Sequence, residues 1–366
     1  MPEAPGLYVH IPFCARKCPY CDFYSEKGAP EERDFFFRAL ERELEGELPF
    51  WREPFGSVFL GGGSPSVLSS GEAQRLEKIL SRARVAKDAE FTLEANPGDL
   101  DRERLKLWRE LGANRLSLGV QTFSPAGLKS LGRVHSPADA FKSARAAADL
   151  GFSLGVDLMV GWSGGKVEVL ERDLETALSL GARHLSVYSL TLNPSGRFFR
   201  ELSAGLRPAL PGEEETAALL DRAASFLSDR GLVRYEVSNY AFPGSECRHN
   251  LKYWNRTPYL GLGPSAHAFT GKTRRANLAP LGLWGEAVLA GKPRLAFQED
   301  LSPEDERLER LFLGLRLRAG LEESLAGDQS LVEGFVARGL LERREGRLLP
   351  TDAGFLAADY LARRLS

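Results

Sequence analysis

The sequence has few cysteines, almost no net charge and no long hydrophobic run. Four cysteines in 366 residues are too few for the dense disulfide framework of a secreted scaffold. The 48 basic and 50 acidic residues leave a net charge of −2, which argues against a surface for nucleic acid. No segment approaches the roughly 18 consecutive apolar residues that would cross a bilayer, and the first predicted strand begins too early to leave room for a targeting peptide. We therefore expect a soluble, cytoplasmic, globular protein.

Three of the four cysteines nevertheless lie in one N-terminal loop, at Cys14, Cys18 and Cys21. A structural zinc site needs four protein ligands, whereas a 4Fe-4S cluster held by three thiolates leaves one iron free to bind a small molecule. The spacing C-x3-C-x2-C therefore favours an open, reactive cluster. Zinc remains an alternative only if Cys247 or a histidine supplies the fourth ligand. Thiolates that bind iron must stay reduced, which also favours the cytoplasm.

Apolar strand-like runs alternate with amphipathic helical stretches through the first half of the chain. The predicted strands cover residues 7–12, 57–60, 90–95, 115–120, 154–160 and 184–190, and the predicted helices 30–48, 69–83, 101–111, 137–150 and 167–180. This alternation indicates parallel strands joined by helical crossovers. Six such units predict an α/β fold, a partial (β/α)6 barrel that is about three-quarters closed.

Unusual residues recur where these strands end, and active sites of βα-barrels collect at the C-terminal ends of their strands. The cysteine loop follows the first strand, and the run Gly61 to Pro65 follows the second. Polar residues close or occupy the next strands, and they are Glu94, Gln121, Asp157 and Tyr188. We expect these strand ends to meet at one ligand.

The run from Leu7 to Cys14, with the two cysteines and the aromatic residues that follow it, resembles the radical S-adenosylmethionine (SAM) superfamily. Within that superfamily it is similar to the branch of oxygen-independent coproporphyrinogen III dehydrogenases and HemW-type haem chaperones. The resemblance implies the same partial barrel and a 4Fe-4S cluster whose open iron chelates SAM. It also implies SAM or cluster contacts at Tyr8, Tyr20, Gly62, Gly63, Ser64, Glu94, Gln121, Arg133 and Asp157. Taken singly, each polar residue is equally compatible with ordinary polarity at a barrel mouth.

A second informative stretch begins at Cys247 and contains His249, Asn250, Tyr253 and Trp254. A histidine beside a cysteine and two large aromatic residues offers axial ligands and flat surfaces suited to a porphyrin. The string matches the H-N-x-x-Y-W motif of the HemW-type chaperones, which implies haem handling here. Without that resemblance, a lone histidine among aromatic residues is more often a satisfied core residue. Cys247 is a second candidate axial ligand.

One position separates the two branches of the family. The resemblance implies that the dehydrogenases carry a further cysteine two positions after the third and a long N-terminal extension. This chain has Phe23 at that position and begins almost directly at the motif, which favours the chaperone. We therefore predict that haem is captured and delivered to an apo-haemoprotein, for example a respiratory membrane enzyme, with the cluster and SAM shaping or gating the haem site.

Two other functions are alternatives at this point. One is an enzyme that cleaves SAM reductively and decarboxylates a porphyrinogen; the other is a zinc-stabilised binding module without redox chemistry. No residue is assigned a catalytic role. A homodimer bridged by the cluster or by haem is compatible with the sequence.

The C-terminal region has a different texture from about Leu301 onward. Charged helical stretches over 303–317 and 330–337 precede two short strands around Gly346 and a last helix over 351–365. This order predicts a small α+β, winged-helix-like domain. The predicted domains are thus a barrel at 1–235, a haem-site segment and connection at 236–300, and the C-terminal domain at 301–366. If that domain bound DNA, its phosphate contacts would be Arg343, Arg344 and Arg347, but the near-neutral charge favours a packing or docking role.

Overall fold

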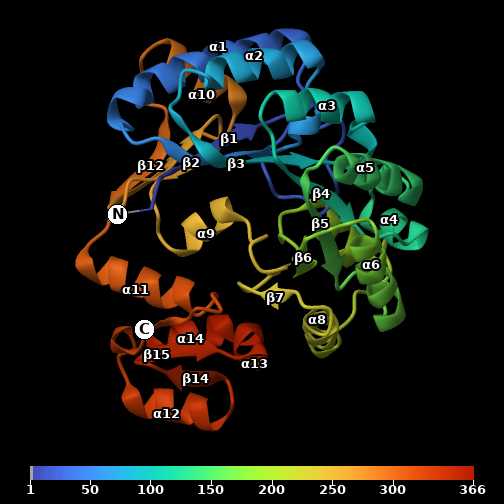
Figure 1. Cartoon of the computed structure of the whole chain (residues 1–366), viewed down its shortest axis with the longest axis vertical. Helices are drawn as coiled ribbons and strands as arrows, with labels where there is room; N and C mark the ends of the chain where they lie inside the picture. The colour runs from blue at the N-terminus through green and yellow to red at the C-terminus, as the bar shows by residue number, and fades with distance from the viewer. Residues whose placement is uncertain (1–2) are drawn as a thin grey trace.

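A twisted sheet of twelve strands organises most of the molecule in the computed structural model, which describes residues 3–366 (Figure 1). Its centre is a run of six neighbouring parallel strands, each buried along most of its length. These strands are β1 (Gly6–Ile11), β2 (Phe55–Gly62), β3 (Val85–Ala95), β4 (Arg115–Gln121), β5 (Ser153–Val160) and β6 (His184–Ser189). All six predicted strands are confirmed, and so is the α/β barrel-like fold.

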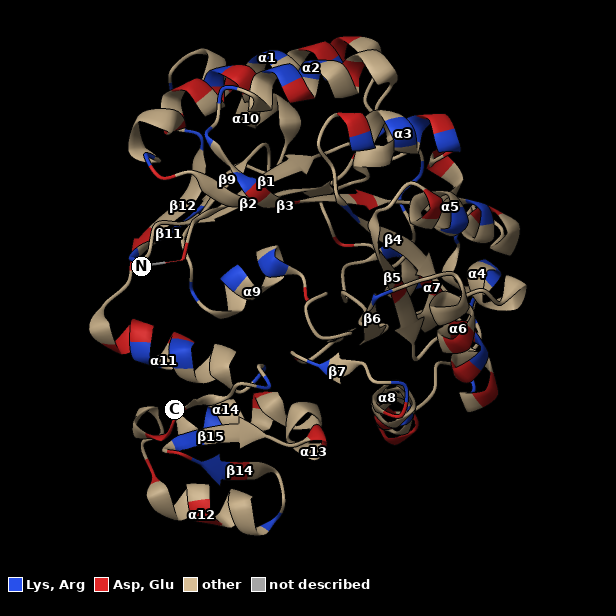
Figure 2. Ribbon diagram, in the orientation of Figure 1, with Lys and Arg blue, Asp and Glu red and all other residues tan. Residues whose placement is uncertain are grey.

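Helices connect these strands and cover the outer face of the sheet (Figure 1). The large hydrophobic core lies between this face and the helices. Serine side chains cap several helices: Ser69 and Ser136 each accept the N3 backbone N–H at the start of α2 and α5. The connecting helices are α1 (Pro30–Glu47), α2 (Ser70–Leu80), α3 (Arg102–Glu110), α4 (Pro125–Leu131), α5 (Pro137–Asp149), α6 (Val167–Ser179), α7 (Arg197–Ser203) and α8 (Glu213–Ser228). Acidic and basic residues are interspersed along α1, α2 and α3 (Figure 2).

Later strands extend the sheet at both edges. Beyond β6 lie β8 (Asn239–Ala241) and β7 (Val233–Arg234), both antiparallel. At the other edge β9 (Tyr259–Leu262) pairs in parallel with β1, followed by the antiparallel strands β10 (His267–Phe269), β11 (Thr273–Asn277) and β12 (Leu295–Asp300). The sheet therefore crosses the predicted limit at residue 235, and that domain limit stays a prediction. Helix α10 (Leu281–Leu289) packs on α1.

The C-terminal unit has its own hydrophobic cluster and a three-stranded antiparallel sheet in the order β13-β15-β14. Two residues with positive φ, Glu345 at 52° and Gly346 at 75°, form the turn between its last two strands. The predicted last helix is interrupted at Ala357, whose ψ of 11° ends α13. The elements are α11 (Pro303–Gly314), β13 (Leu321–Glu322), α12 (Gln329–Ala337), β14 (Leu341–Arg344), β15 (Arg347–Pro350), α13 (Asp352–Leu356) and α14 (Ala358–Leu365).

Two of the arginines considered for DNA contacts are used within this unit. Arg343 pairs with Glu323, and Arg347 donates hydrogen bonds to the Ala319 and Gly320 carbonyls. These contacts hold β14 and β15 against the segment that precedes α12. Within the described residues, no helix is long and apolar enough to cross a membrane.

Candidate functional site

The three clustered cysteines lie in the loop that follows β1, at the C-terminal mouth of the barrel. Backbone hydrogen bonds fix this loop, from Cys14 N to Glu26 O at 2.9 Å and from Cys21 N to Cys18 O at 3.1 Å. All three thiols are free and partly buried. They line one cavity of about 180 Å³ together with Tyr20. The three cysteines therefore converge on a shared space that is open to a ligand.

Burial controls the protonation of these thiols. It raises the pKa of Cys14 to about 11, against a smaller opposing effect from Ser25, and it also raises the pKa of Cys21. Near neutral pH both are thiols in the metal-free protein. Since a metal binds the thiolate, loading this site must release protons.

The glycine run at the end of β2 lies directly against the cysteine loop. Gly63 N donates to Ile11 O and Ser64 N to Phe13 O, both at 2.8 Å. A Cβ atom on Gly63 would fall 2.6 Å from Phe13 O, so only glycine allows this approach. The donors are already used within the protein, since Gly62 N also bonds Glu94 Oε2 at 3.3 Å. The glycines thus shape the site by letting two backbone segments meet.

Two acidic residues, Glu94 on β3 and Asp157 on β5, face this cavity from neighbouring strands. Burial raises the pKa of Glu94 to about 8, and the Asp157 charge raises it further. Burial also raises the pKa of Asp157, although hydroxyls of Ser186 and Ser117 donate to its carboxylate at 2.7 and 3.2 Å. At neutral pH Glu94 can therefore hold a proton beside an acceptor carboxylate.

Gln121 and Arg133 complete the wall of the same cavity. Gln121 has a φ of 70°, an unfavourable value for a non-glycine residue, and its Oε1 accepts a hydrogen bond from Tyr188 at 2.9 Å. Arg133 Nη1 donates to Cys18 Sγ at 3.3 Å, while its Nη2 donates to Asn96 Oδ1 and Gly119 O. Arg133 thus ties the cysteine loop to the ends of β3 and β4.

The structure brings together most of the predicted cluster and SAM residues. One cavity is lined by Cys14, Cys18, Cys21, Tyr20, Gly62, Gly63, Ser64, Glu94, Gln121, Arg133 and Asp157. Tyr8 does not line this cavity; its hydroxyl contacts His10 Nδ1 at 3.2 Å and its ring packs near Phe59. Sequence reasoning missed the serines that hold Asp157. The available signal was the alternation of β4 and β6, which turns Ser117 and Ser186 to the interior.

A larger cavity of about 570 Å³ adjoins the first and shares several of its walls, including Tyr20, Cys21 and Asp157. It extends along the barrel interior to Arg115, His184 and the start of α9 (Arg248–Trp254). Its volume lies within the range of small-molecule sites, roughly 300–1,000 Å³.

His249 lies in α9 on the concave side of the sheet and is fully buried (Figure 1). Its Nδ1 is 2.8 Å from Ser57 Oγ and its Nε2 is 2.9 Å from the Tyr253 hydroxyl. Burial lowers the pKa of His249 to about 3, so the ring is neutral. Both ring nitrogens are engaged, so the ring would have to break one of these bonds to ligate iron.

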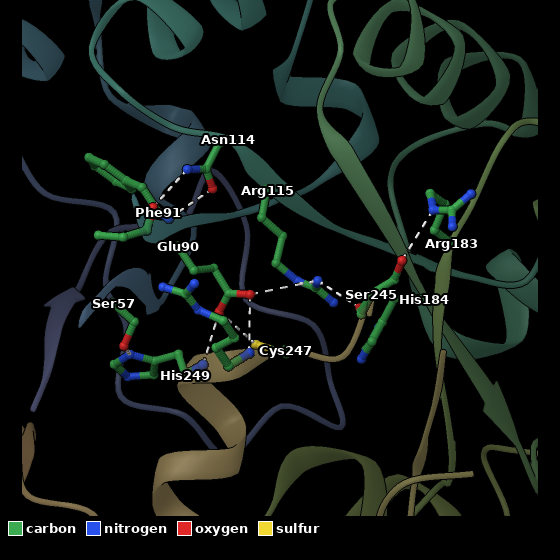
Figure 3. Close-up of polar contacts among 12 residues, drawn as sticks. Ser57, Glu90, Phe91, Asn114, Arg115, Arg183, His184, Ser245, Cys247 and His249 are labelled. Atoms are coloured by element: carbon green, nitrogen blue, oxygen red, sulfur yellow. Dashed lines mark hydrogen bonds and ion pairs between the residues drawn. The ribbon is translucent and has the colours of Figure 1, made fainter. Parts of the chain in front are cut away.

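The other residues of the second motif point to different places. Asn250 lines the 570 Å³ cavity, Tyr253 lines a separate cavity of about 550 Å³, and Trp254 lines a third. Cys247 precedes α9, and its Sγ lies 3.5 Å from Glu90 Oε1 (Figure 3). Burial raises the pKa of Cys247 to about 12, with a further increase from Glu90. Cys247 does not line the cavity of the other three cysteines, so it is not their fourth ligand in this structure.

Known proteins resemble this chain over its whole length. The Radical SAM superfamily profile matches residues 8–177, which contain the cysteine loop and the polar residues of the smaller cavity. A protein of Bacillus subtilis named "Heme chaperone HemW" is 35% identical over 365 residues, which are 96% of each chain. The HemW of Escherichia coli is 39% identical over 72% of this chain and 69% of its own.

The chain belongs to the HemW family. Membership in the radical SAM superfamily implies a 4Fe-4S cluster and SAM, and the three free cysteines around one cavity fit such a cluster. A solved structure of the E. coli coproporphyrinogen III oxidase HemN, described as a radical SAM enzyme, superimposes with a TM-score of 0.85. It covers 100% of this HemW-family chain and 91% of its own at 23% identity, which supports the shared fold.

Proposed function

We propose that this protein is a haem chaperone that carries a 4Fe-4S cluster on Cys14, Cys18 and Cys21, binds SAM beside it and delivers haem to an apo-haemoprotein. The similarity to a curated haem chaperone over 96% of both chains carries this proposal. Phe23 supports it, because this residue stands where the related dehydrogenases have a further cysteine. It is largely exposed at the cavity mouth. A respiratory membrane enzyme is the kind of acceptor we expect.

The residues of the smaller cavity have distinct tasks in this proposal. When bound, the cluster supplies an iron with an open coordination position for SAM. Glu94 and Asp157 offer a hydrogen-bond donor and an acceptor for hydroxyl or ammonium groups. Arg133 holds the cysteine loop against β3 and β4, and the fixed backbone of Gln121 presents its amide at the cavity wall. These residues bind and orient a ligand without any step of bond cleavage.

The test is to reconstitute the cluster anaerobically and divide the sample. One part receives haem, and another receives coproporphyrinogen III with SAM and a reductant. We expect stable haem absorbance, transfer of that haem to an apo-haemoprotein, and no decarboxylated tetrapyrrole. A variant with Cys14, Cys18 and Cys21 changed to serine is the matched control for the cluster. Formation of a decarboxylated product together with 5′-deoxyadenosine would replace the chaperone with a dehydrogenase.

A further inference from the structure

The 570 Å³ cavity has two chemically different ends. One end is formed by Tyr20 and Cys21 of the cysteine loop, and the other by Arg115, Cys247 and Asn250. Apolar side chains, among them Phe59, Met159 and Leu190, also line it. An occupant of this space would therefore be partly apolar and would carry a polar group at the end distant from the cysteines.

Arg115 is the only lysine or arginine among the described residues that line this cavity. Its side chain is 4% exposed and reaches between Glu90 and Ser245 (Figure 3). Nη1 donates to Ser245 O at 3.0 Å and lies 3.8 Å from Glu90 Oε2. Nε and Nη2 make no hydrogen bond within residues 3–366, yet they are not among the fully enclosed atoms. Their N–H groups therefore remain accessible to an occupant of the cavity.

The charge of Glu90 is satisfied by groups other than Arg115. Its two oxygens accept hydrogen bonds from Arg248 N at 3.1 Å and His249 N at 2.9 Å, and Cys247 Sγ lies close as well. Because a buried carboxylate with these donors is already stabilised, the guanidinium keeps donors for a second acidic group.

Other polar atoms around this cavity also lack partners. Thr92 Oγ1, His184 Nδ1 and Asn239 Oδ1 are buried and make no hydrogen bond within the described chain, although His184 Nε2 contacts the Tyr235 hydroxyl at 2.8 Å. All three residues line the cavity. Since buried polar groups are normally paired, this concentration indicates a site completed by a polar occupant.

From these observations we propose that Arg115 binds a carboxylate of the molecule that fills the barrel cavity, which for haem is a propionate group. The inference rests on the proposed function, because haem is the ligand that brings the carboxylate. It places the tetrapyrrole between the cysteine loop and Arg115. His249 is then a support for α9 on the far side of Glu90.

The acidic residues of the cavity do not oppose this assignment. Glu94 keeps its proton at neutral pH, since burial raises its pKa to about 8. Asp157 is occupied by the hydroxyls of Ser117 and Ser186. A propionate at Arg115 therefore meets a free guanidinium, and the Asp157 carboxylate has donors of its own.

The experiment compares haem with its dimethyl ester, which keeps the ring and iron but lacks both carboxylates. Absorbance titration of the cluster-loaded protein should give a Kd for haem at least about tenfold below that for the ester, as expected for a charged hydrogen bond. Arg115→Gln should raise the Kd for haem about tenfold and leave the Kd for the ester unchanged, and Arg115→Lys should restore part of the preference. Iron content and SAM affinity report whether the variants remain intact.

A second variant keeps the test decisive if Arg115→Gln does not fold. Asn250→Asp adds a negative charge at the same end of the cavity without changing the side-chain shape, and it should weaken haem severalfold but not the ester. The matched control is Asn255→Asp, the same change at an exposed position just after α9. Equal binding of haem and ester by the unmodified protein, equal weakening of both by Arg115→Gln, or no effect of Asn250→Asp would overturn the inference alone. Binding of neither compound would overturn the proposed function as well.

Discussion

The cysteine loop and helix α9 both carry specific sequence motifs, but their side chains are held differently. In the loop, three free thiols remain partly exposed around a shared cavity, and burial keeps at least two of them protonated. In α9, His249 is fully buried and both of its ring nitrogens have partners. A motif therefore marks important residues without saying whether they bind a ligand or hold the fold.

The state of the hydrogen bonds separates these two roles. Residues at the barrel mouth keep unusual features that cost stability, such as the positive φ of Gln121 and the proximity of Glu94 to Asp157. His249, in contrast, shows the paired contacts expected of a core polar residue. Substitutions should therefore affect ligand binding in the first region and folding in the second.

The largest difference is expected for the cysteines. Replacing Cys14, Cys18 or Cys21 singly by serine should remove nearly all bound iron and sulfide, because a cluster held by three thiolates has no spare protein ligand. Cys247→Ser is the matched control and should leave the iron and sulfide content unchanged. Chemical analysis after anaerobic reconstitution measures both. Loss of the cluster in the Cys247 variant would show that the fourth cysteine belongs to the site after all.

His249→Ala should lower the free energy of unfolding by about 2–4 kcal/mol, since it removes a buried ring and two hydrogen bonds. Ser57→Ala removes one of those partners and should cost about 1 kcal/mol. Denaturant unfolding measures both values. Haem affinity of the folded His249→Ala protein should change less than about twofold. A tenfold loss of haem affinity with unchanged stability would instead identify His249 as an axial ligand.

Local periodicity was enough to predict the six parallel strands and the helices between them. The strand ends then located the cysteine loop, Glu94, Gln121 and Asp157 at one mouth, because parallel strands direct their C-terminal ends to the same side. These inferences needed only the order of elements along the chain. The convergence of these residues on one cavity followed from the fold class.

Contacts between distant parts of the chain were beyond this reasoning. The parallel pairing of β9 with β1 joins segments about 250 residues apart, and no local pattern indicates it. The environment of His249 depends on Ser57, which is 192 residues away. For the same reason the H-N-x-x-Y-W string gave no warning that Asn250, Tyr253 and Trp254 line three different cavities.

The raised pKa of Glu94 predicts a pH dependence of stability in the metal-free protein. Between pH 4.5 and about 8 the folded state holds a proton that the unfolded state has released, so stability falls as pH rises through this window. Glu94→Gln removes this contribution. The loss of unfolding free energy between pH 5.5 and 7.5 should then be smaller by about 2 kcal/mol than in the unmodified protein. An identical pH dependence in the two proteins would show that Glu94 titrates normally.

The smallest and most closely matched comparison uses two tyrosines. The Tyr188 hydroxyl bonds Gln121 at the barrel mouth and the Tyr253 hydroxyl bonds His249 in α9, both at 2.9 Å. Tyr188→Phe frees the amide of Gln121, so SAM affinity should fall about two- to fivefold. Tyr253→Phe should lower the unfolding free energy by about 1 kcal/mol and leave SAM affinity unchanged. Equilibrium binding of SAM and denaturant unfolding, measured on both variants, compare the same lost hydroxyl in the two regions. If Tyr253→Phe weakened SAM binding and Tyr188→Phe did not, the proposed division between a binding region and a supporting helix would be wrong.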